Sequence, residues 1–359
     1  MGWACKAGGR RISRPPAFSA QLGRITAGGF VTLSILWKIF AGILLGGTVL
    51  TILGPMVGEI IATLPPLFPP KDRNPLTVLG LSFEDVAFPT ADGLTLRGWW
   101  IPAGSPNAPA VIYAPGTGHD QRSGLALAGP LHQAGYHVLL FSYRGYGESD
   151  GDEFGFTYGQ RESEDIDAAV RFLKEQKGVK AIGVIGFSAG AASAILSASR
   201  NPDVRAVVAA ASFTSVSEVW NANMPAFIPL FFREWLIMLA EWRKGFQREA
   251  VEPIKVVSQI APRPLLLIYG DADRRVTLAH ARRLQRAAGP TAQFWVVRGA
   301  THRAIGDEAL VLLAPDIVAF LNQALRHRPD RQMAGISLQP ASFSTQPLLT
   351  SRRVTLPSY

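Results

Sequence analysis

Six continuous apolar runs restrict the fold of this chain more than any other feature. Segments with helical periodicity separate these runs, which lie at 110–114, 137–142, 181–187, 204–210, 264–270 and 293–299. A strand that is apolar on both sides belongs in a sheet whose two faces are both covered. Strands that alternate with helices build a mostly parallel sheet. The sequence therefore predicts an α/β fold with helices on both faces of the sheet.

Two earlier runs, 83–88 and 94–101, alternate apolar and polar residues. The tripeptide Ala91-Asp92-Gly93 between them is typical of a tight turn, so we expect this pair to form antiparallel strands. The predicted sheet then has eight strands.

The excess positive charge lies mainly near the two ends of the chain. The 359 residues carry a formal charge of +9, and the first 38 include six basic residues. A nucleic-acid-binding surface interleaves basic and aromatic residues in one stripe, which this sequence lacks, so we expect no nucleic-acid partner. The single cysteine, Cys5, excludes an intramolecular disulfide. Nothing in the sequence indicates an oligomeric state.

An uncharged apolar stretch covers residues 39–58. As a helix, its 20 residues would extend about 30 Å, the thickness of the hydrocarbon layer of a bilayer. A buried core helix is the alternative. A cleaved signal peptide fits less well, because the leader of 38 residues is long and no A-x-A-like site follows. The sequence predicts a single-pass membrane anchor, with the N-terminus in the cytoplasm and the rest of the chain outside it, in the periplasm if the chain is bacterial.

The composition changes along the chain and predicts five segments. Around the anchor, we expect a basic cytoplasmic arm over 1–38 and a stiff proline-rich linker over 59–81. The folded domain is predicted over 82–327. A tail rich in Ser, Thr, Pro and Gln, expected to be flexible, follows over 328–359.

One short motif points to nucleophilic chemistry. The sequence Gly186-Phe187-Ser188-Ala189-Gly190 follows an apolar run and opens a helix of small residues, the setting expected for a serine on a strained strand-to-helix turn. A serine hydroxyl needs a general base, itself oriented by a carboxylate. Asp271 and Asp273 follow one late strand and His302 follows the next. The chain order Ser, Asp, His is the one expected for this architecture.

With these motifs, residues 82–327 resemble the α/β-hydrolase superfamily. "GFSAG" resembles its nucleophile elbow, "YGDADRRV" its acid turn and "RGATH" its histidine loop. "FSYRGYGESDG" is similar to a signature of membrane-anchored serine hydrolases akin to monoacylglycerol lipases and serine aminopeptidases.

The resemblance implies a role for each of these residues. Ser188 would be the nucleophile, His302 the base and Asp273, rather than Asp271, the acid. It also implies that the backbone N–H groups of Thr117 and Ala189 form an oxyanion hole. Pro115 replaces the histidine usual in that loop, which leaves its register open by one residue.

Between the strands ending near 210 and starting at 264, residues of about 213–258 are expected to form a short cap. Apolar side chains recur there at three- and four-residue steps, at Phe227, Phe231, Trp235, Leu239 and Trp242. The stripe could pack on the domain, dip into a membrane interface, or line an acyl pocket. In the last case, Phe227, Phe231 and Trp235 would bind substrate.

The function predicted from these features is that of a serine hydrolase, which cleaves carboxylic esters or thioesters of a small or lipid-like acyl substrate through an acyl-enzyme. No metal or organic cofactor is implied. An acyltransferase or an aminopeptidase-like enzyme on the same triad is the alternative, the latter with Glu234 or Glu241 holding the substrate's amino group. A catalytically silent, membrane-tethered binding module is the alternative of another class.

Overall fold

The computed structural model describes residues 33–49, 53–54, 57, 72–151, 155–326 and 351–355. The chain divides into two compact units, Met1–Pro55 and Met56–Tyr359. In the first unit, residues 33–49 are helical.

The membrane anchor predicted over 39–58 is not supported. Within the described ranges, no helix combines the length and the apolarity needed to cross a bilayer. The helix at 33–49 covers only the first part of the predicted anchor, and residues 50–58 lie largely outside the described residues. The predicted topology and localisation stay predictions.

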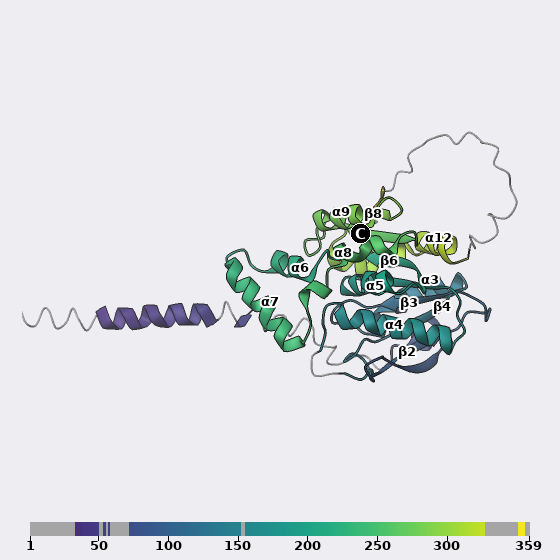
Figure 1. Ribbon diagram of the computed structural model, residues 1–359, viewed down its shortest axis with the longest axis horizontal. Coiled ribbons are helices and arrows are strands. Elements are labelled where there is room, and N and C mark those ends of the chain that lie inside the picture. The colour runs from purple at the N-terminus through teal and green to yellow at the C-terminus, as the bar shows by residue number, and fades with distance from the viewer. Residues whose placement is uncertain are drawn as a thin grey trace, which may run out of the picture. The chain divides into compact units, whose positions relative to one another are not determined.

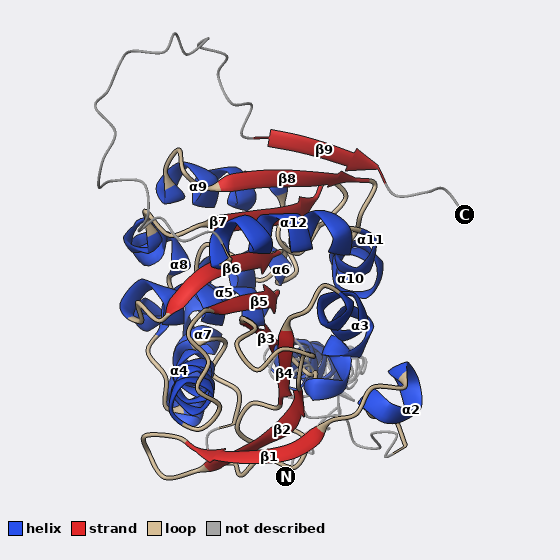
Figure 2. Ribbon diagram, turned by 90° about the vertical axis from the view of Figure 1, so that its right-hand side faces the viewer, coloured by secondary structure: helices blue, strands red, loops and turns tan. Residues whose placement is uncertain are grey.

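The second unit is built on one nine-stranded sheet with the order β1-β2-β4-β3-β5-β6-β7-β8-β9 (Figure 2). Its strands are β1 (Glu84–Pro89), β2 (Thr95–Ile101), β3 (Ala110–Ala114), β4 (His137–Phe141), β5 (Ile182–Phe187), β6 (Val204–Ala210), β7 (Leu265–Gly270), β8 (Gln293–Arg298) and β9 (Ser351–Thr355). The β1–β2 and β2–β4 pairs are antiparallel, and all the others are parallel. The α/β fold and the eight predicted strands are confirmed.

The ninth strand was not predicted. Strand β9 pairs with β8 from Phe294↔Ser351 to Arg298↔Thr355, inside the segment 328–359 that was predicted to be a flexible tail. The outer edge of β8 offers a row of backbone donors and acceptors, so a short extended segment can pair there without apolar periodicity of its own.

Most helices of the second unit lie in two layers, one on each face of the sheet, and α6 (Val216–Asn223) and α7 (Leu230–Lys244) lie to one side (Figures 1 and 2). Its other helices are α2 (Pro75–Leu79), α3 (Leu125–Gln133), α4 (Gln160–Glu175), α5 (Ala189–Arg200), α8 (Pro253–Val256), α9 (Leu278–Ala288), α10 (His302–Ala304), a π-helix (Ile305–Ala309), α11 (Leu310–Leu312) and α12 (Ala314–Leu325). Short 3-10 turns occupy Gln121–Gly124, Arg248–Ala250 and Val257–Ile260. Helix α2 falls inside the segment predicted as linker.

Alternate residues of the central strands supply two separate cores. Ile112 and Val184 pack with α4, α5 and α9 on one face, whereas Val111 and Ile185 pack with α3 and α12 on the other. Because successive side chains of a strand point to opposite faces, a strand buried on both sides needs the continuous apolar runs seen in the sequence. Helices α6 and α7 form the cap and lie to one side of these layers (Figure 1).

Arg144 stabilises the loop that follows β4 through buried hydrogen bonds. Its side chain is 1% exposed and donates to Asp165 on α4 and to Asp92 in the β1–β2 turn, with N···O distances of 2.7 Å to each. Burial acts against the charged form, but hydrogen bonds and the charges of Asp165 and Asp92 raise the pKa of Arg144. This buried ion pair holds three distant segments together.

The buried His137 predicts a loss of stability in acid. Burial lowers the pKa of His137 below its usual 6.5, and its Nδ1 accepts the N–H of Ala103 at 2.8 Å. The unfolded chain therefore takes up a proton that the folded one excludes. The free energy of unfolding is therefore unaffected by the titration of His137 above pH 6.5. As the pH falls from 6.5 toward the lowered pKa, it decreases by up to about 1.4 kcal/mol per pH unit.

Denaturant unfolding between pH 7.5 and 5 measures this slope. The variant His137→Asn is expected to flatten it, although the burial that lowers the pKa of His280 leaves a residual slope. The exposed His119, changed to asparagine, is the matched control and should keep the full slope. Equal slopes in both variants would contradict the assignment to His137.

Candidate active site

Ser188 lies on a sharp turn between β5 and α5. Its φ of +54° is in the left-handed region, which costs a residue with a side chain about 1–3 kcal/mol. The turn requires a glycine on each side. A Cβ at Gly186 would lie 2.3 Å from the carbonyl oxygen of Gly190, and one at Gly190 would lie 2.1 Å from that of Ala114. The motif thus forms the strained elbow expected from the sequence.

The structure brings Ser188, His302 and Asp273 together although they lie far apart in the chain. His302 begins α10 just after β8, and its Nε2 is 3.0 Å from Ser188 Oγ. Its Nδ1 is 2.7 Å from Oδ2 of Asp273, which follows β7. All three strands are parallel, so the residues that follow them meet at the same edge of the sheet.

The geometry distinguishes Asp273 from its neighbour Asp271. The Asp273 side chain is fully buried, and its Oδ1 accepts the N–H groups of Arg275 and Val276, which leaves Oδ2 facing His302. Asp271 instead accepts the N–H of Gly299 at 2.6 Å. Asp273 contacts the imidazole, and Asp271 ties the acid turn to the histidine loop.

The loop after β3 borders the elbow. Because Gly190 packs against the carbonyls of Ala114 and Pro115, the backbone of this loop lies against the start of α5. Ala189 is the first residue of α5, where an N–H has no acceptor within the helix. The N–H of Thr117 has no acceptor among the described residues, and its carbonyl is hydrogen-bonded to His119 Nδ1 at 2.9 Å. Among the described residues, neither predicted oxyanion donor is used in a hydrogen bond, and their role stays a prediction.

Phe187 is a site residue that the sequence did not indicate. Its ring centroid is 5.2 Å from that of His302. A Cβ added to Gly116 would lie 3.0 Å from this ring, and one on Gly306 of the π-helix would lie 2.8 Å from it. The phenyl ring thus fills the space between the histidine, the loop after β3 and the π-helix. No periodicity marks it, because the position before the serine accepts many residues in such motifs.

The cap residues predicted to bind substrate are exposed. Phe227, Phe231 and Trp235 have exposed fractions of 73, 67 and 40%. Phe231 and Trp235 lie on α7 and Phe227 lies in the turn before it, so these side chains do not pack on the domain, which was one of the alternatives. Their role in substrate binding stays a prediction.

Within the described residues, no group of three or more His, Cys, Asp or Glu side chains is arranged to hold a metal ion.

Comparison with known protein families gives the site its context. A model of the prolyl oligopeptidase family matches residues 126–328, which is more than half of the chain and includes Ser188, Asp273 and His302. The chain belongs to the prolyl oligopeptidase family. An uncharacterized protein of Mycobacterium tuberculosis is 33% identical over 226 residues, which cover 61% of this chain and 72% of that protein.

Two further similarities concern proteins with a described activity. A thiohydrolase of Aspergillus aculeatus is 32% identical over 189 residues, which cover 52% of this chain and 55% of the thiohydrolase. The solved structure of an esterase from Pyrococcus furiosus is 26% identical, with a TM-score of 0.59, and covers 73% of this family member and 98% of the esterase. The predicted α/β-hydrolase superfamily is confirmed, whereas the branch of monoacylglycerol lipases and serine aminopeptidases stays a prediction.

Proposed function

We propose that this member of the prolyl oligopeptidase family is a serine hydrolase that cleaves esters or thioesters of carboxylic acids. The observation that carries the proposal is the continuous hydrogen-bonded chain from Ser188 through His302 to Asp273. The backbone N–H groups of Thr117 and Ala189, which donate to no acceptor among the described residues, are the proposed oxyanion hole.

The distances support a two-step reaction. Ser188 Oγ attacks the carbonyl carbon of the ester while His302 Nε2 takes the hydroxyl proton. The carbonyl oxygen becomes an oxyanion that accepts the N–H groups of Thr117 and Ala189. When the tetrahedral intermediate collapses, the bond to the leaving group breaks and His302 returns the proton to it. Water then attacks the acyl-enzyme with His302 again acting as the base, which releases the acid and restores Ser188.

Asp273 makes His302 a base in the correct tautomer. Because its carboxylate accepts the Nδ1–H, the lone pair of the neutral ring is at Nε2, opposite Ser188. Once the ring is protonated, the same carboxylate stabilises its charge.

Contacts within the cap favour an ester over a peptide with a free amino end. An aminopeptidase needs a carboxylate that can bind the substrate's ammonium group. The two cap acids suggested by the sequence, Glu234 and Glu241, both accept hydrogen bonds from the Arg248 guanidinium, at 2.6 and 2.8 Å. The esterase and thiohydrolase activities named for similar proteins agree with this preference.

Probe labelling and paired substrates test the proposal. The intact protein should react with a fluorophosphonate, and peptide mapping should place the adduct on Ser188. It should also hydrolyse p-nitrophenyl acyl esters with a kcat/KM at least about 100-fold above that for aminoacyl p-nitroanilides, since a site lacking an ammonium partner forgoes that binding energy. No labelling of the folded protein would support the silent binding module, and a preference for the anilides would support the peptidase.

The position of Phe187 predicts a selective loss of turnover. Phe187→Ala removes the ring that packs on His302, so the imidazole can move away from Ser188. Misplacement by about 1 Å can cost roughly 100-fold in rate, and we expect kcat for ester hydrolysis to fall by about that factor with KM nearly unchanged. The variant Phe187→Leu, which retains most of the contact, should recover part of the rate. An unchanged kcat in Phe187→Ala would show that the ring does not position the histidine.

A further inference from the structure

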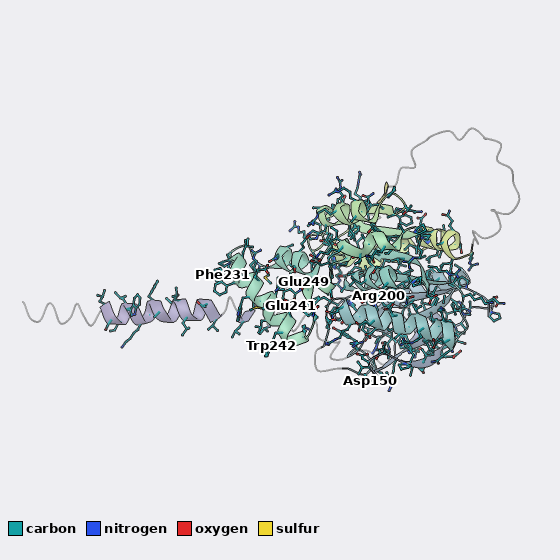
Figure 3. All side chains as sticks on the ribbon, in the orientation of Figure 1. Asp150, Arg200, Phe231, Glu241, Trp242 and Glu249 are labelled. Atoms are coloured by element: carbon teal, nitrogen blue, oxygen red, sulfur yellow. The ribbon has the colours of Figure 1, made fainter. Side chains whose placement is uncertain are left out.

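Helix α7 presents a stripe of large apolar side chains to solvent. On α7, Phe231, Trp235, Met238 and Trp242 recur at steps of four, three and four residues and are all exposed, Trp242 to 80%; Phe227, in the turn before α7, is exposed as well. We call these five residues the α7 stripe. Figure 3 labels Phe231 and Trp242 near the two ends of α7, on its side away from the sheet.

The α7 stripe is a second apolar face on a helix that already has one. The opposite side of α7 buries Leu236, Ile237 and Ala240. A helix at a protein surface usually has a polar outer face, and a continuous exposed apolar patch marks a surface that binds something apolar. The contacts that α7 makes with its own domain do not require the stripe.

Three of the five charged side chains of α7 interact with residues outside the helix. Glu234 and Glu241 pair with Arg248. The guanidinium of Arg233 donates to the backbone carbonyls of Asn221, Pro225 and Ile228. Because these three charged groups are paired, they need not lose their hydration when the stripe leaves water. The free-energy cost of desolvating this face of α7 is therefore low.

A second uncovered apolar surface occurs in the same chain, next to a basic segment. The helix at 33–49 exposes large apolar side chains along its length, including Trp37 at 67%. The first 38 residues contain six Lys or Arg and no Asp or Glu. Basic residues close to an anionic lipid surface are attracted to it and strengthen binding. This charge complementarity points to anionic lipid rather than to another protein.

We propose that the α7 stripe docks on the surface of an anionic lipid bilayer. Phe, Trp, Leu and Met suit the boundary between head groups and acyl chains, where an amphipathic helix lies with its apolar face buried about 5–10 Å deep. One lipid surface accounts for the stripe, the exposed helix at 33–49 and the basic arm together. A protein partner would have to match each of them separately.

The 25 residues from 50 to 74 join the helix at 33–49 to the second unit and can extend at most about 90 Å. A segment bound by its basic arm raises the effective concentration of the stripe at the same surface, so a weak contact of α7 becomes effective. The docking concerns the surface of α7 and does not depend on hydrolysis at Ser188.

A polarity-sensitive fluorophore on α7 tests the proposal in the full chain. In a Cys5→Ser background, Met238→Cys places a nitrobenzoxadiazole label in the stripe, and Lys180→Cys places it in the exposed loop between α4 and β5. Vesicles of phosphatidylcholine with about 30% phosphatidylglycerol should raise the emission at position 238 about threefold. Acyl-chain spin labels should quench it, and neither change should occur at position 180.

Two outcomes would overturn the proposal. In the first, the protein floats with the vesicles while the label at 238 stays in water, which would show that the N-terminal segment binds alone. Alternatively, the emission rises with protein concentration without vesicles, in which case a second copy of the chain covers the stripe. The double change Phe231→Ser and Trp242→Ser should abolish the response at 238, whereas Leu312→Ser, an exposed apolar residue outside the stripe, should leave it intact.

Discussion

Replacing Ser188 by alanine is expected to lower kcat for ester hydrolysis by roughly 10⁶-fold and to abolish labelling by a fluorophosphonate. Comparable losses follow when the serine or histidine of a triad is removed alone, because the three residues act as a unit. His302→Ala should therefore reduce kcat by a similar factor, since Ser188 Oγ then has no base within 3.0 Å. Single-turnover kinetics with a p-nitrophenyl ester would measure both losses.

Matched variants separate the triad from its surroundings. Asp273→Asn removes the acceptor for the Nδ1–H of His302, allows the wrong tautomer and should lower kcat by about 10⁴-fold. Asp271→Asn changes a carboxylate only two residues away that contacts Gly299 instead, so its effect on kcat should be far smaller. Ser199→Ala, at the distant end of α5, is the control for the serine. Activity that survives Ser188→Ala, or equal losses in the two aspartate variants, would refute the proposed roles.

Replacing Gly190 by alanine is expected to destabilise the domain by about 3 kcal/mol. Alanine favours a helix over glycine by about 1 kcal/mol, so α5 alone would gain stability. Its Cβ, however, would lie 2.1 Å from Ala114 O and 2.3 Å from Pro115 O, which are backbone atoms. Overpacking of this kind typically costs up to about 3 kcal/mol, and more where backbone must move. The loop that carries Thr117 must shift, so kcat should fall as well.

The control is the same substitution in a helix that has room for it. A Cβ at Gly129 in α3 would lie 3.5 Å from Leu79 Cδ2, an ordinary contact. Gly129→Ala should therefore be neutral or stabilise by up to about 1 kcal/mol. Thermal unfolding should show a midpoint lowered by roughly 6–12 °C for Gly190→Ala and unchanged or raised for Gly129→Ala. Equal midpoints would mean that the elbow tolerates a side chain.

The strands and the residues of the proposed catalytic site could be predicted because the sequence patterns that indicate them are local. A strand buried on both faces needs a continuous apolar run, and β3 and β6 occur within the predicted limits. The elbow needs glycines on both sides of Ser188, and those glycines are adjacent in sequence. Asp273 and His302 each follow a late strand. Because the carboxyl ends of parallel strands lie at the same edge of a sheet, this placement was sufficient to suggest that both residues lie near Ser188.

The features that were missed depend on contacts between distant residues. The place of Phe187 beside His302 needs Gly116 and Gly306, which lie more than 70 and 110 residues away in the chain. Strand β9 forms because β8 has an open edge, not because its own sequence is apolar. The stripe on α7 has the same periodicity as a buried one, and only its exposed fractions distinguish an uncovered face from a packed one.

By itself, the sequence predicted the α/β architecture and the elbow from residue types at local spacing, and it predicted the roles of Ser188, Asp273 and His302 from their order and from the resemblance to the α/β-hydrolase superfamily. Only the tertiary structure decided that Asp273 Oδ2 lies 2.7 Å from His302 while Asp271 contacts Gly299, that Arg248 engages the cap acids and that α7 exposes its aromatic residues. Those outcomes depend on where separate segments come to lie in space. Periodicity specifies which side of a helix is apolar, but not what covers it.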